Sequence, residues 1–188
     1  NDSKDATPYM LLDFYQKSRG RYRIQPMRKT KWGDVKDLGR VTNMAEYRNI
    51  MKYLCETWES SEYSIIFDSE VGFSKDTFSQ MRQILQENDN IAMVTPFGTV
   101  NNSRRYYDTY AYESLNGKYG VIPRNLDVLT RVNSAFAGFV LMRTEVIQKC
   151  EWKAISNKVS EHNHFCSMVR DYGYVVIARD IKVSWKST

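Results

Sequence analysis

The stretch that decides the fold is EYSIIFDSEVGFSKDTF, residues 62–78. Its residues 63–67 are typical of a buried β-strand, and Asp68 and Glu70 follow directly. In an extended chain the two acidic side chains point the same way, so that their like charges repel. A divalent cation such as Mg²⁺ or Mn²⁺ between them would remove that repulsion, because hard ions prefer carboxylate oxygens. Two solvent-facing acids at a strand end are the alternative, and the pair alone leaves both interpretations open.

Apolar spacing and end residues predict helices elsewhere in the chain. Over residues 43–58 the spacing predicts an amphipathic helix with Met51 on its apolar face and Asn49 on its polar face. Residues 161–172 are predicted to form another helix, because Ser160 is a favoured N-cap and a glycine follows the last residue.

Apolar runs predict strands at residues 90–95, 134–143, 174–178 and 181–185. The long polar segment 98–130 is predicted to be mostly loop, and loops of this length often line a site. Helices alternating with apolar strands indicate an α/β fold, a single domain over residues 1–188 whose central sheet is flanked by helices. In such sheets ligands bind beyond the carboxyl ends of strands, which is the place of Asp68 and Glu70.

Composition narrows the classes of protein. Hydrophobic residues make up 42% and charged residues 26%, which is the profile of an ordinary globular domain. The sequence has neither an apolar run near 18 residues nor a signal-peptide pattern. The three cysteines, an odd number without C-x-x-C spacing, make a disulfide framework or a zinc cluster unexpected and suit a reducing compartment.

The net charge of +5 indicates a negatively charged partner, such as nucleic acid, phosphate or an anionic surface. Basic residues gather at residues 19–31, although a solvated loop explains that cluster equally well. The charge therefore keeps a nucleic-acid-binding domain among the candidates, but no recognised nucleic-acid motif supports it.

Three segments of the first half, NDSKDAT, NMAEYRN and YSIIFDSE, resemble in this order the motifs of the nucleotide-sugar glycosyltransferases of the GT-A fold. NDSKDAT (residues 1–7) resembles their D-D-G-S-x-D-G-T turn, and NMAEYRN (residues 43–49) resembles the A-x-x-R-N helix that follows. YSIIFDSE (residues 63–70) occupies the place of their D-x-D strand. The resemblance implies a Rossmann-like GT-A domain with a mixed sheet.

Residues 104–120, 132–147 and 159–185 of the second half are similar to segments of the fungal capsule mannosyltransferases. RRYYDTYAYESLNGKYG (residues 104–120) resembles their F-Y-D-T-W-x-x-R-D-x-x-G stretch. Residues 132–147 are similar to their V-x-S-C-W-N-G strand, and residues 159–185 to their closing helix and strands. The small glycosyltransferases encoded by chlorella viruses also resemble this chain, so that a viral protein is one expected identity.

The sequence departs from the family in three places. Glu70 replaces an aspartate, which lengthens the reach to a metal ion, and Ala137 stands where the capsule enzymes have asparagine. The chain also begins inside the first turn of the family pattern. At least one strand is therefore expected upstream of residue 1.

The resemblance implies a metal site and a nucleotide site. Glu70 would bind Mn²⁺ or Mg²⁺ directly, and His164 would be a further ligand, whereas His162 is expected to lie in a solvated turn. Asp68 would bind the ribose or, through water, the metal. The residues placed where the family holds the base and the ribose are Asn1, Asp2 and Asp5.

Three more residues are predicted to act at this site. Arg48 would contact the nucleotide or its phosphates, unless it pairs locally with acids such as Glu46 of its own helix. Glu161 would be the general base if transfer inverts the anomeric centre, and would orient the acceptor if transfer retains it. Asp108 would contact a sugar hydroxyl, with a turn-forming aspartate as the alternative, and neighbouring tyrosines would stack on the sugar.

The predicted function is therefore a metal-dependent glycosyltransferase that moves a hexose or deoxyhexose from a nucleotide-diphosphate sugar to a glycan hydroxyl. UDP is favoured over GDP as the donor base. A catalytically inactive GT-A domain that binds sugar or nucleotide is the first alternative, and a basic nucleic-acid-binding domain is the second. The expected location is the cytoplasm, that of the host for a viral protein, or the Golgi lumen if an anchor lies upstream.

Overall fold

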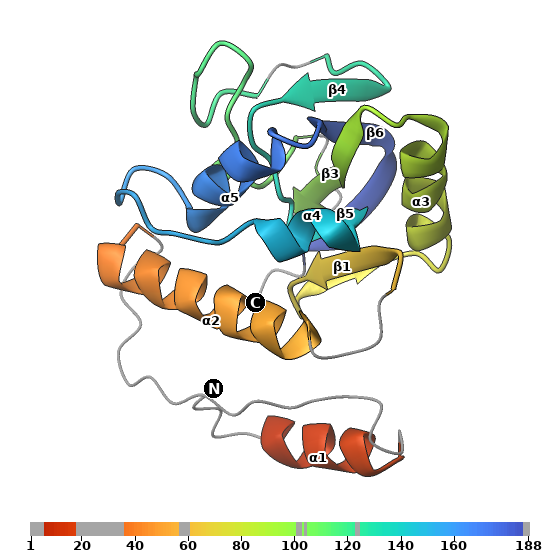
Figure 1. Cartoon of the computed structure of the whole chain (residues 1–188), viewed down its shortest axis with the longest axis vertical. Helices are drawn as coiled ribbons and strands as arrows, with labels where there is room; N and C mark the ends of the chain where they lie inside the picture. The colour runs from red at the N-terminus through yellow and green to blue at the C-terminus, as the bar shows by residue number, and fades with distance from the viewer. Residues whose placement is uncertain are drawn as a thin grey trace.

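The computed structural model describes residues 6–17, 36–56, 61–100, 103, 105–122 and 125–185 (Figure 1). Its helices are α1 (Thr7–Lys17), α2 (Leu38–Glu56), α3 (Thr77–Glu87), α4 (Thr144–Lys149) and α5 (Glu161–Val169). Its strands are β1 (Tyr63–Phe67), β2 (Val71–Phe73), β3 (Ile91–Val100), β4 (Leu129–Val132), β5 (Phe139–Arg143) and β6 (Tyr174–Trp185).

The strands form one mixed sheet in the order β1-β5-β3-β6-β2, and β4 pairs with β6 off this path. The central pair, β3 and β6, is parallel, whereas the other pairs are antiparallel. The helices α3 and α5 lie on different sides of the sheet (Figure 1). The predicted α/β fold, with a mixed central sheet flanked by helices, is confirmed.

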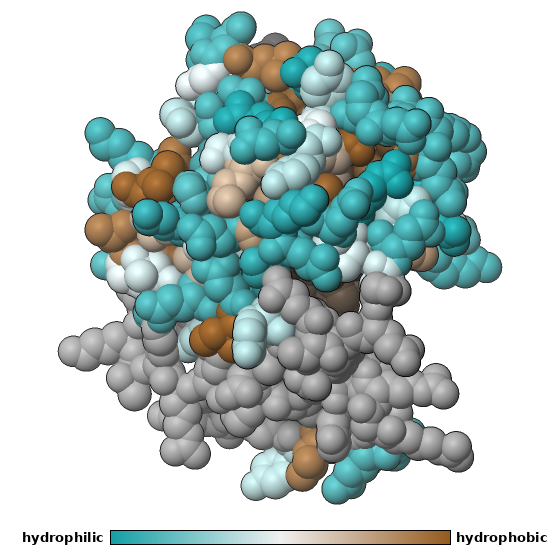
Figure 2. All heavy atoms as spheres, in the orientation of Figure 1, coloured by the Kyte–Doolittle hydropathy of each residue, from teal (hydrophilic) through white to brown (hydrophobic). Residues whose placement is uncertain are grey.

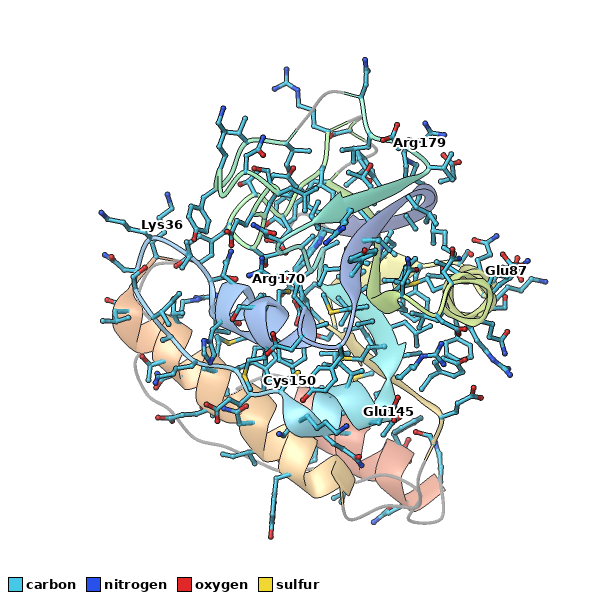
Figure 3. All side chains as sticks on the ribbon, turned by 45° about the horizontal axis from the view of Figure 1, so that its top comes forward. Lys36, Glu87, Glu145, Cys150, Arg170 and Arg179 are labelled. Atoms are coloured by element: carbon cyan, nitrogen blue, oxygen red, sulfur yellow. The ribbon has the colours of Figure 1, made fainter. Side chains whose placement is uncertain are left out.

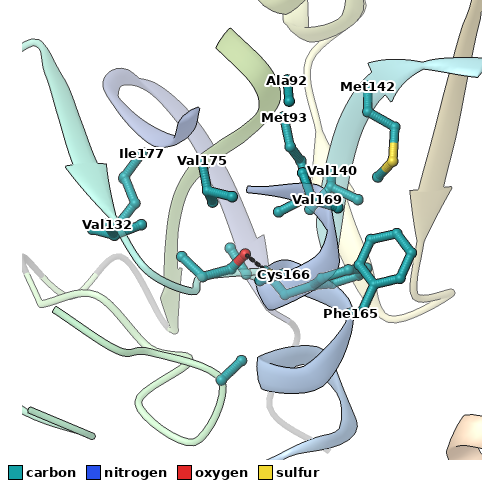
Figure 4. Close-up of a cluster of buried hydrophobic side chains, with 14 of the residues drawn as sticks. Ala92, Met93, Val132, Val140, Met142, Phe165, Cys166, Val169, Val175 and Ile177 are labelled. Atoms are coloured by element: carbon teal, nitrogen blue, oxygen red, sulfur yellow. Dashed lines mark hydrogen bonds between the residues drawn. The ribbon is translucent and has the colours of Figure 1, made fainter. Parts of the chain in front are cut away.

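Side-chain alternation along the central strands builds a core on each face of the sheet. Met93 of β3 packs on the α5 side, and its neighbour Val94 packs on the α3 side. The α5 side holds Phe165 and Val169 of that helix against the sheet (Figure 4). The α3 side is closed by Met81, which has no exposed surface. Because both faces are covered, the central strands read as continuous apolar runs.

Several predicted boundaries were wrong. The two strands predicted at 174–178 and 181–185 are one strand, β6, because the chain bulges between them: Pro96 pairs with Ala178, but the next residue of β3 pairs with Lys182. The strand β5 begins five residues later than the predicted start at residue 134, since a turn precedes it. The helix α5 ends three residues before Tyr172, where we expected it to end.

The predicted loop at 98–130 is also shorter than expected. The strand β3 continues through Val100 and β4 begins at Leu129, so regular structure enters the segment from both ends. The residues described between these strands contain no further strand or helix, and Asp108 lies among them.

The orientation of α2 differs from the prediction. Asn49 faces the protein interior, where its amide donates to the Trp152 carbonyl at 2.8 Å and accepts from the Trp152 backbone N–H at 2.9 Å. Met51, which the apolar spacing placed inside, is 44% exposed. Ala45 and Arg48, together with the apolar Val41, face inward instead. The apolar spacing was misleading because this helix delivers polar groups to a site.

Most side chains on the visible face of the described part are hydrophilic, with apolar ones scattered among them (Figure 2). None of the described helices has the length and apolar character needed to cross a membrane. Cys150, which follows α4 (Figure 3), and Cys166 of α5 are buried free thiols. Burial raises the pKa of each thiol to about 11, so that both are protonated near neutral pH.

Candidate functional site

Arg48 joins the two acids that the sequence placed at a site. Its Nε donates to Oε1 of Glu161, the first residue of α5, at 3.1 Å. Its Nη2 lies 3.4 Å from Oδ1 of Asp68, which directly follows β1. The side chains of Arg48 and Glu161 are only 12% and 7% exposed. Hydrogen bonds thus join three residues that the sequence predicted to act at one site. In these bonds Arg48 pairs with Asp68 and Glu161 and not with an acid of its own helix.

The chain turns immediately after β1. The Val71 N–H donates to the Asp68 carbonyl at 3.1 Å, and the Asp68 N–H donates to the Gly138 carbonyl at 2.8 Å. Strand alternation, on which the shared direction of Asp68 and Glu70 was predicted, therefore does not apply beyond Phe67. Glu70 is exposed in this turn, whereas the charge of Asp68 is offset by Arg48.

Asp108 connects the long loop to the turn before β5. Its Oδ1 accepts from the Ala111 N–H at 3.2 Å, and its Oδ2 accepts from the Ala137 N–H at 3.0 Å. Burial raises the pKa of Asp108 to about 6; the two N–H donors oppose this, whereas the nearby charges of Asp68 and Glu161 add to it. Asp108 thus forms a turn, as one alternative held, and also lies within the field of the other two acids.

The turn that Asp108 holds is strained. Ala137 has a φ of 55° and Gly138 a φ of 66°, both in the left-handed region. For alanine this conformation costs about 1–2 kcal/mol, while asparagine tolerates it better. The asparagine of the resembling capsule enzymes would suit this backbone, and Ala137 occupies it at a cost. Such strain is often found at functional sites.

His162 is part of the same cluster, although the sequence predicted a solvated turn for it. It is 6% exposed, and its ring stacks on Phe136 with a centroid distance of 3.6 Å. Its Nδ1 accepts from Nε1 of Trp152 at 3.3 Å, and its Nε2 lies 3.5 Å from Oε1 of Glu161. Burial, and secondly the positive charge of Arg48, hold the pKa of His162 well below its ordinary value, so the ring is neutral near pH 7.

The remaining predicted residues are a second histidine on α5 and three residues outside the described ranges. His164 is half-buried on α5, two residues beyond His162. The three predicted nucleotide contacts, Asn1, Asp2 and Asp5, lie outside the described residues, as does the basic segment 19–31.

The acids beyond β1 are candidate ligands for a divalent cation. Within the described ranges no three His, Cys, Asp or Glu side chains are arranged to hold a metal ion. Asp68 and Glu70 nevertheless offer two hard oxygen ligands around one turn. Mg²⁺ at nucleotide sites commonly uses one or two carboxylates and takes its other ligands from substrate phosphates and water. A divalent ion at this turn would therefore need most of its ligands from a bound nucleotide and water.

We expect the raised pKa of Asp108 to appear in the pH dependence of stability. The folded protein keeps a proton on Asp108 that the unfolded chain releases, so this carboxyl makes stability fall as pH rises from about 4 to about 6. Because one pKa unit corresponds to about 1.4 kcal/mol, the loss is at most about 3 kcal/mol. Asp108→Asn should remove this pH-dependent loss. The free energy of unfolding of the variant should therefore rise relative to that of the native protein over this pH interval.

The measurement is urea unfolding at a series of pH values with EDTA present. Asp127→Asn, which changes an exposed acid, is the control and should keep the native pH profile. Parallel profiles for native protein and Asp108→Asn would contradict the raised pKa.

Comparisons with known proteins agree with the fold. No protein-family model matches the sequence, and no curated protein sequence matches it significantly. The structure is similar to that of GalNAc-T7 solved with UDP, GalNAc and Mn²⁺, with a TM-score of 0.63 at 9% identity. That alignment covers 100% of this chain and 36% of the other, so this chain spans about a third of that protein's length.

A second structure, A197 from STIV, aligns with a TM-score of 0.47 and 16% identity over 95% of this chain and 87% of that one. The similarity to GalNAc-T7 shows a GT-A-like fold, as the sequence resemblance implied.

Proposed function

We propose that the chain is a glycosyltransferase domain that moves a hexose or deoxyhexose from a nucleotide-diphosphate sugar to a glycan hydroxyl, with UDP favoured over GDP. The observation that carries this proposal is that Arg48 joins Asp68 and Glu161 beyond the end of β1 in a GT-A-like fold, with Asp108 near enough for both acids to raise its pKa. The structural neighbour was solved with UDP, GalNAc and Mn²⁺, which supports a UDP-sugar and a divalent cation as the first ligands to test.

The donor side of the site is assigned to the acids near β1 and to Arg48. Asp68 binds the ribose or, through water, the metal, and Glu70 and His164 are the proposed metal ligands. A bound Mn²⁺ or Mg²⁺ would offset the charge that develops on the diphosphate leaving group. Arg48 contributes a second positive charge to the same phosphates. The base and ribose are assigned to residues near the N-terminus: Asn1, Asp2 and Asp5.

The acceptor side is assigned to Glu161 and Asp108. In an inverting reaction the acceptor oxygen attacks the anomeric carbon, the bond from that carbon to the phosphate oxygen breaks, and Glu161 takes the hydroxyl proton. In a retaining reaction Glu161 orients the acceptor instead. Asp108 contacts a sugar hydroxyl next to the strained turn. Exposed Tyr107, whose ring lies 5.1 Å from that of Trp185, offers an aromatic surface for a sugar ring beside them.

The buried free thiols support a reducing compartment, and we propose the cytoplasm, which is that of the host if the protein is viral. The Golgi lumen remains the assignment if an anchor precedes this chain.

Calorimetric titration of UDP and of GDP, each with and without Mn²⁺, tests the donor site. We expect UDP to bind in the presence of Mn²⁺, and Glu70→Ala or Asp68→Asn to weaken binding at least about tenfold, the free energy of one charge-assisted contact. Glu151→Ala, which removes an exposed acid after α4, is the control and should bind as the native chain does. Failure of both nucleotides to bind under every condition would overturn the proposal.

An inactive GT-A domain is the second candidate, because Glu70 replaces the family aspartate and Arg48 already neutralises Asp68. It predicts nucleotide binding without transfer. Incubating the metal-loaded complex with UDP-sugars and glycan acceptors distinguishes the two, since only the transferase releases UDP in proportion to acceptor.

A further inference from the structure

The helix α1 has an apolar side that the protein does not bury. Met10, Leu11 and Leu12 are 69%, 44% and 53% exposed, and the other α1 side chains that the structure describes are exposed as well. In α3, which also has 11 residues, Met81 and Leu85 have no exposed surface. Packing on the sheet therefore accounts for the apolar side chains of α3 but not for those of α1, which lies beyond α2 and away from the sheet (Figure 1).

The side chains of α1 are divided between a polar and an apolar side. Asp13, Gln16 and Lys17 follow the spacing i, i+3, i+4 and share one side, where Nζ of Lys17 lies 2.7 Å from Oδ2 of Asp13. Successive residues are about 100° apart around the helix axis, so that residues 10–12 form the opposite side. An amphipathic helix of this kind suits a boundary between water and an apolar phase.

The sequence that follows α1 is basic. Residues 14–33 contain no Asp or Glu. Seven basic residues fall within residues 17–31: Lys17, Arg19, Arg21, Arg23, Arg28, Lys29 and Lys31. Chain connectivity ties these positive charges to the C-terminal end of α1, so that an exposed apolar side and a run of one charge sign are neighbours in the chain.

Three kinds of partner differ in how they would use these two features. Nucleic acid would pair with the basic residues but would leave the apolar side of α1 in water. A second copy of this chain would cover the apolar side, but it carries the same net charge of +5 and repels the first copy. An anionic lipid surface offers negative charge directly above an apolar layer and so uses both features.

We propose that α1 is a membrane-surface helix. Its apolar side, Met10, Leu11 and Leu12, inserts among the headgroups of an anionic lipid surface, to which the positive charge of the following sequence attracts the chain. With 11 residues α1 is too short to span the hydrocarbon core, which takes about 20 residues, so it lies in the plane of the surface. The proposal goes beyond sugar transfer and requires neither nucleotide nor metal.

Flotation of the whole chain with lipid vesicles tests the choice of surface. Vesicles of phosphatidylcholine with about one third phosphatidylserine should bind the protein at least about tenfold more tightly than vesicles of phosphatidylcholine alone, because each basic residue near the surface adds to the attraction. Binding should weaken by a similar factor when NaCl rises from about 0.1 M to about 0.5 M, since salt screens these charges. Equal binding to both kinds of vesicle, or no binding to the anionic ones, would overturn the proposal.

Leu12→Ser tests whether α1 itself inserts. It should weaken binding to the anionic vesicles at least about fivefold, because part of the transfer free energy of one leucine is lost. Leu115→Ser is the matched control: Leu115, in the long loop, is 52% exposed, and its loss should leave binding unchanged. Leu12→Met, which stays apolar and favours a helix, should bind as the native chain does.

The substituted residues are exposed, so the variants should keep the native unfolding transition, which circular dichroism checks. If Leu12→Ser binds anionic vesicles as tightly as Leu115→Ser does, charge alone holds the protein there, and α1 is not the docking element.

Sedimentation equilibrium tests the second copy as the rival partner. We expect native protein and Leu12→Ser to be monomeric at the same concentration. A native dimer that Leu12→Ser dissociates would assign the apolar side of α1 to a second copy, against the proposal. These experiments contain no nucleotide, so the membrane-surface helix and the transferase function can fail independently of each other.

Discussion

Replacing Gly138 by alanine is expected to lower the free energy of unfolding by about 2–5 kcal/mol. Gly138 has a φ of 66°, a conformation that costs a residue with a Cβ about 1–2 kcal/mol. The added Cβ would also overlap the Trp185 ring and lie 2.8 Å from Cγ2 of Val71. The ring cannot withdraw easily, because its Nε1 donates to the Ala137 carbonyl at 3.1 Å. Overpacking of this kind adds about 1–3 kcal/mol.

Gly117→Ala is the matched control for Gly138→Ala. Gly117 has a φ of 71°, but an added Cβ would meet no atom within 4 Å. Its substitution should therefore cost only the backbone term, about 1–2 kcal/mol. Chemical denaturation of the two variants gives the difference directly. Equal losses in both would mean that the space around Gly138 is not as tight as the structure has it.

The same substitution should disturb the site. The Gly138 carbonyl accepts the Asp68 N–H at 2.8 Å, so a shift of the turn moves the acid that is assigned to the nucleotide. We expect Gly138→Ala to weaken UDP binding where Gly117→Ala does not.

The fold and the two acids at its site were predictable because their signals are local. Windows of a few residues are enough to predict the strand before Asp68 and the helix that begins at Glu161. They are also enough to predict the alternation of helices with apolar runs. The resemblance to GT-A enzymes then placed these windows in a known order. Local signals also placed Asp68 directly after a strand, and the structure has it directly after β1.

The cluster itself could not be read from the sequence, because its contacts join distant segments. Arg48 and Glu161 are 113 residues apart in the sequence. The ring of His162 stacks on Phe136 and accepts a hydrogen bond from Trp152. These contacts determine which face of α2 points to the interior, and that face is not the one that its apolar spacing predicts. A histidine directly after the predicted base was the available signal, but on its own it is equally compatible with an exposed turn.

The single β6 strand illustrates the same limit at the level of the backbone. The polar pair Arg179 and Asp180 looks like a break between two strands, and the two side chains indeed pair with each other at 2.8 Å. The parallel partner β3 continues past them, so the strand bulges rather than ends. Only the pairing with β3 shows that β6 has a bulge here and not an end.

Arg48 should be the side chain whose loss the fold tolerates least among the polar residues of this cluster. It offsets Glu161, whose side chain is 7% exposed, and it lies 3.4 Å from Asp68. Removing one partner of a buried ion pair leaves the other charge buried with neither a counter-charge nor water around it, which typically costs about 3–5 kcal/mol. Arg48→Met keeps the length and apolar stem of the side chain, and we expect it to cost this amount at pH 8, where His162 is neutral.

The decisive measurement is a double-mutant cycle with Glu161→Gln. In the native background Glu161→Gln should destabilise, since Arg48 loses a partner. In the Arg48→Met background the same change removes the unpaired buried charge, so it should restore about 1–3 kcal/mol. Lys17→Met, which breaks an ion pair whose side chains are 75% and 58% exposed, should leave stability nearly unchanged. If Glu161→Gln destabilises both backgrounds equally, Arg48 and Glu161 do not interact as the structure indicates. A change of sign would establish that Arg48 and Glu161 form a buried ion pair in which each charge offsets the other.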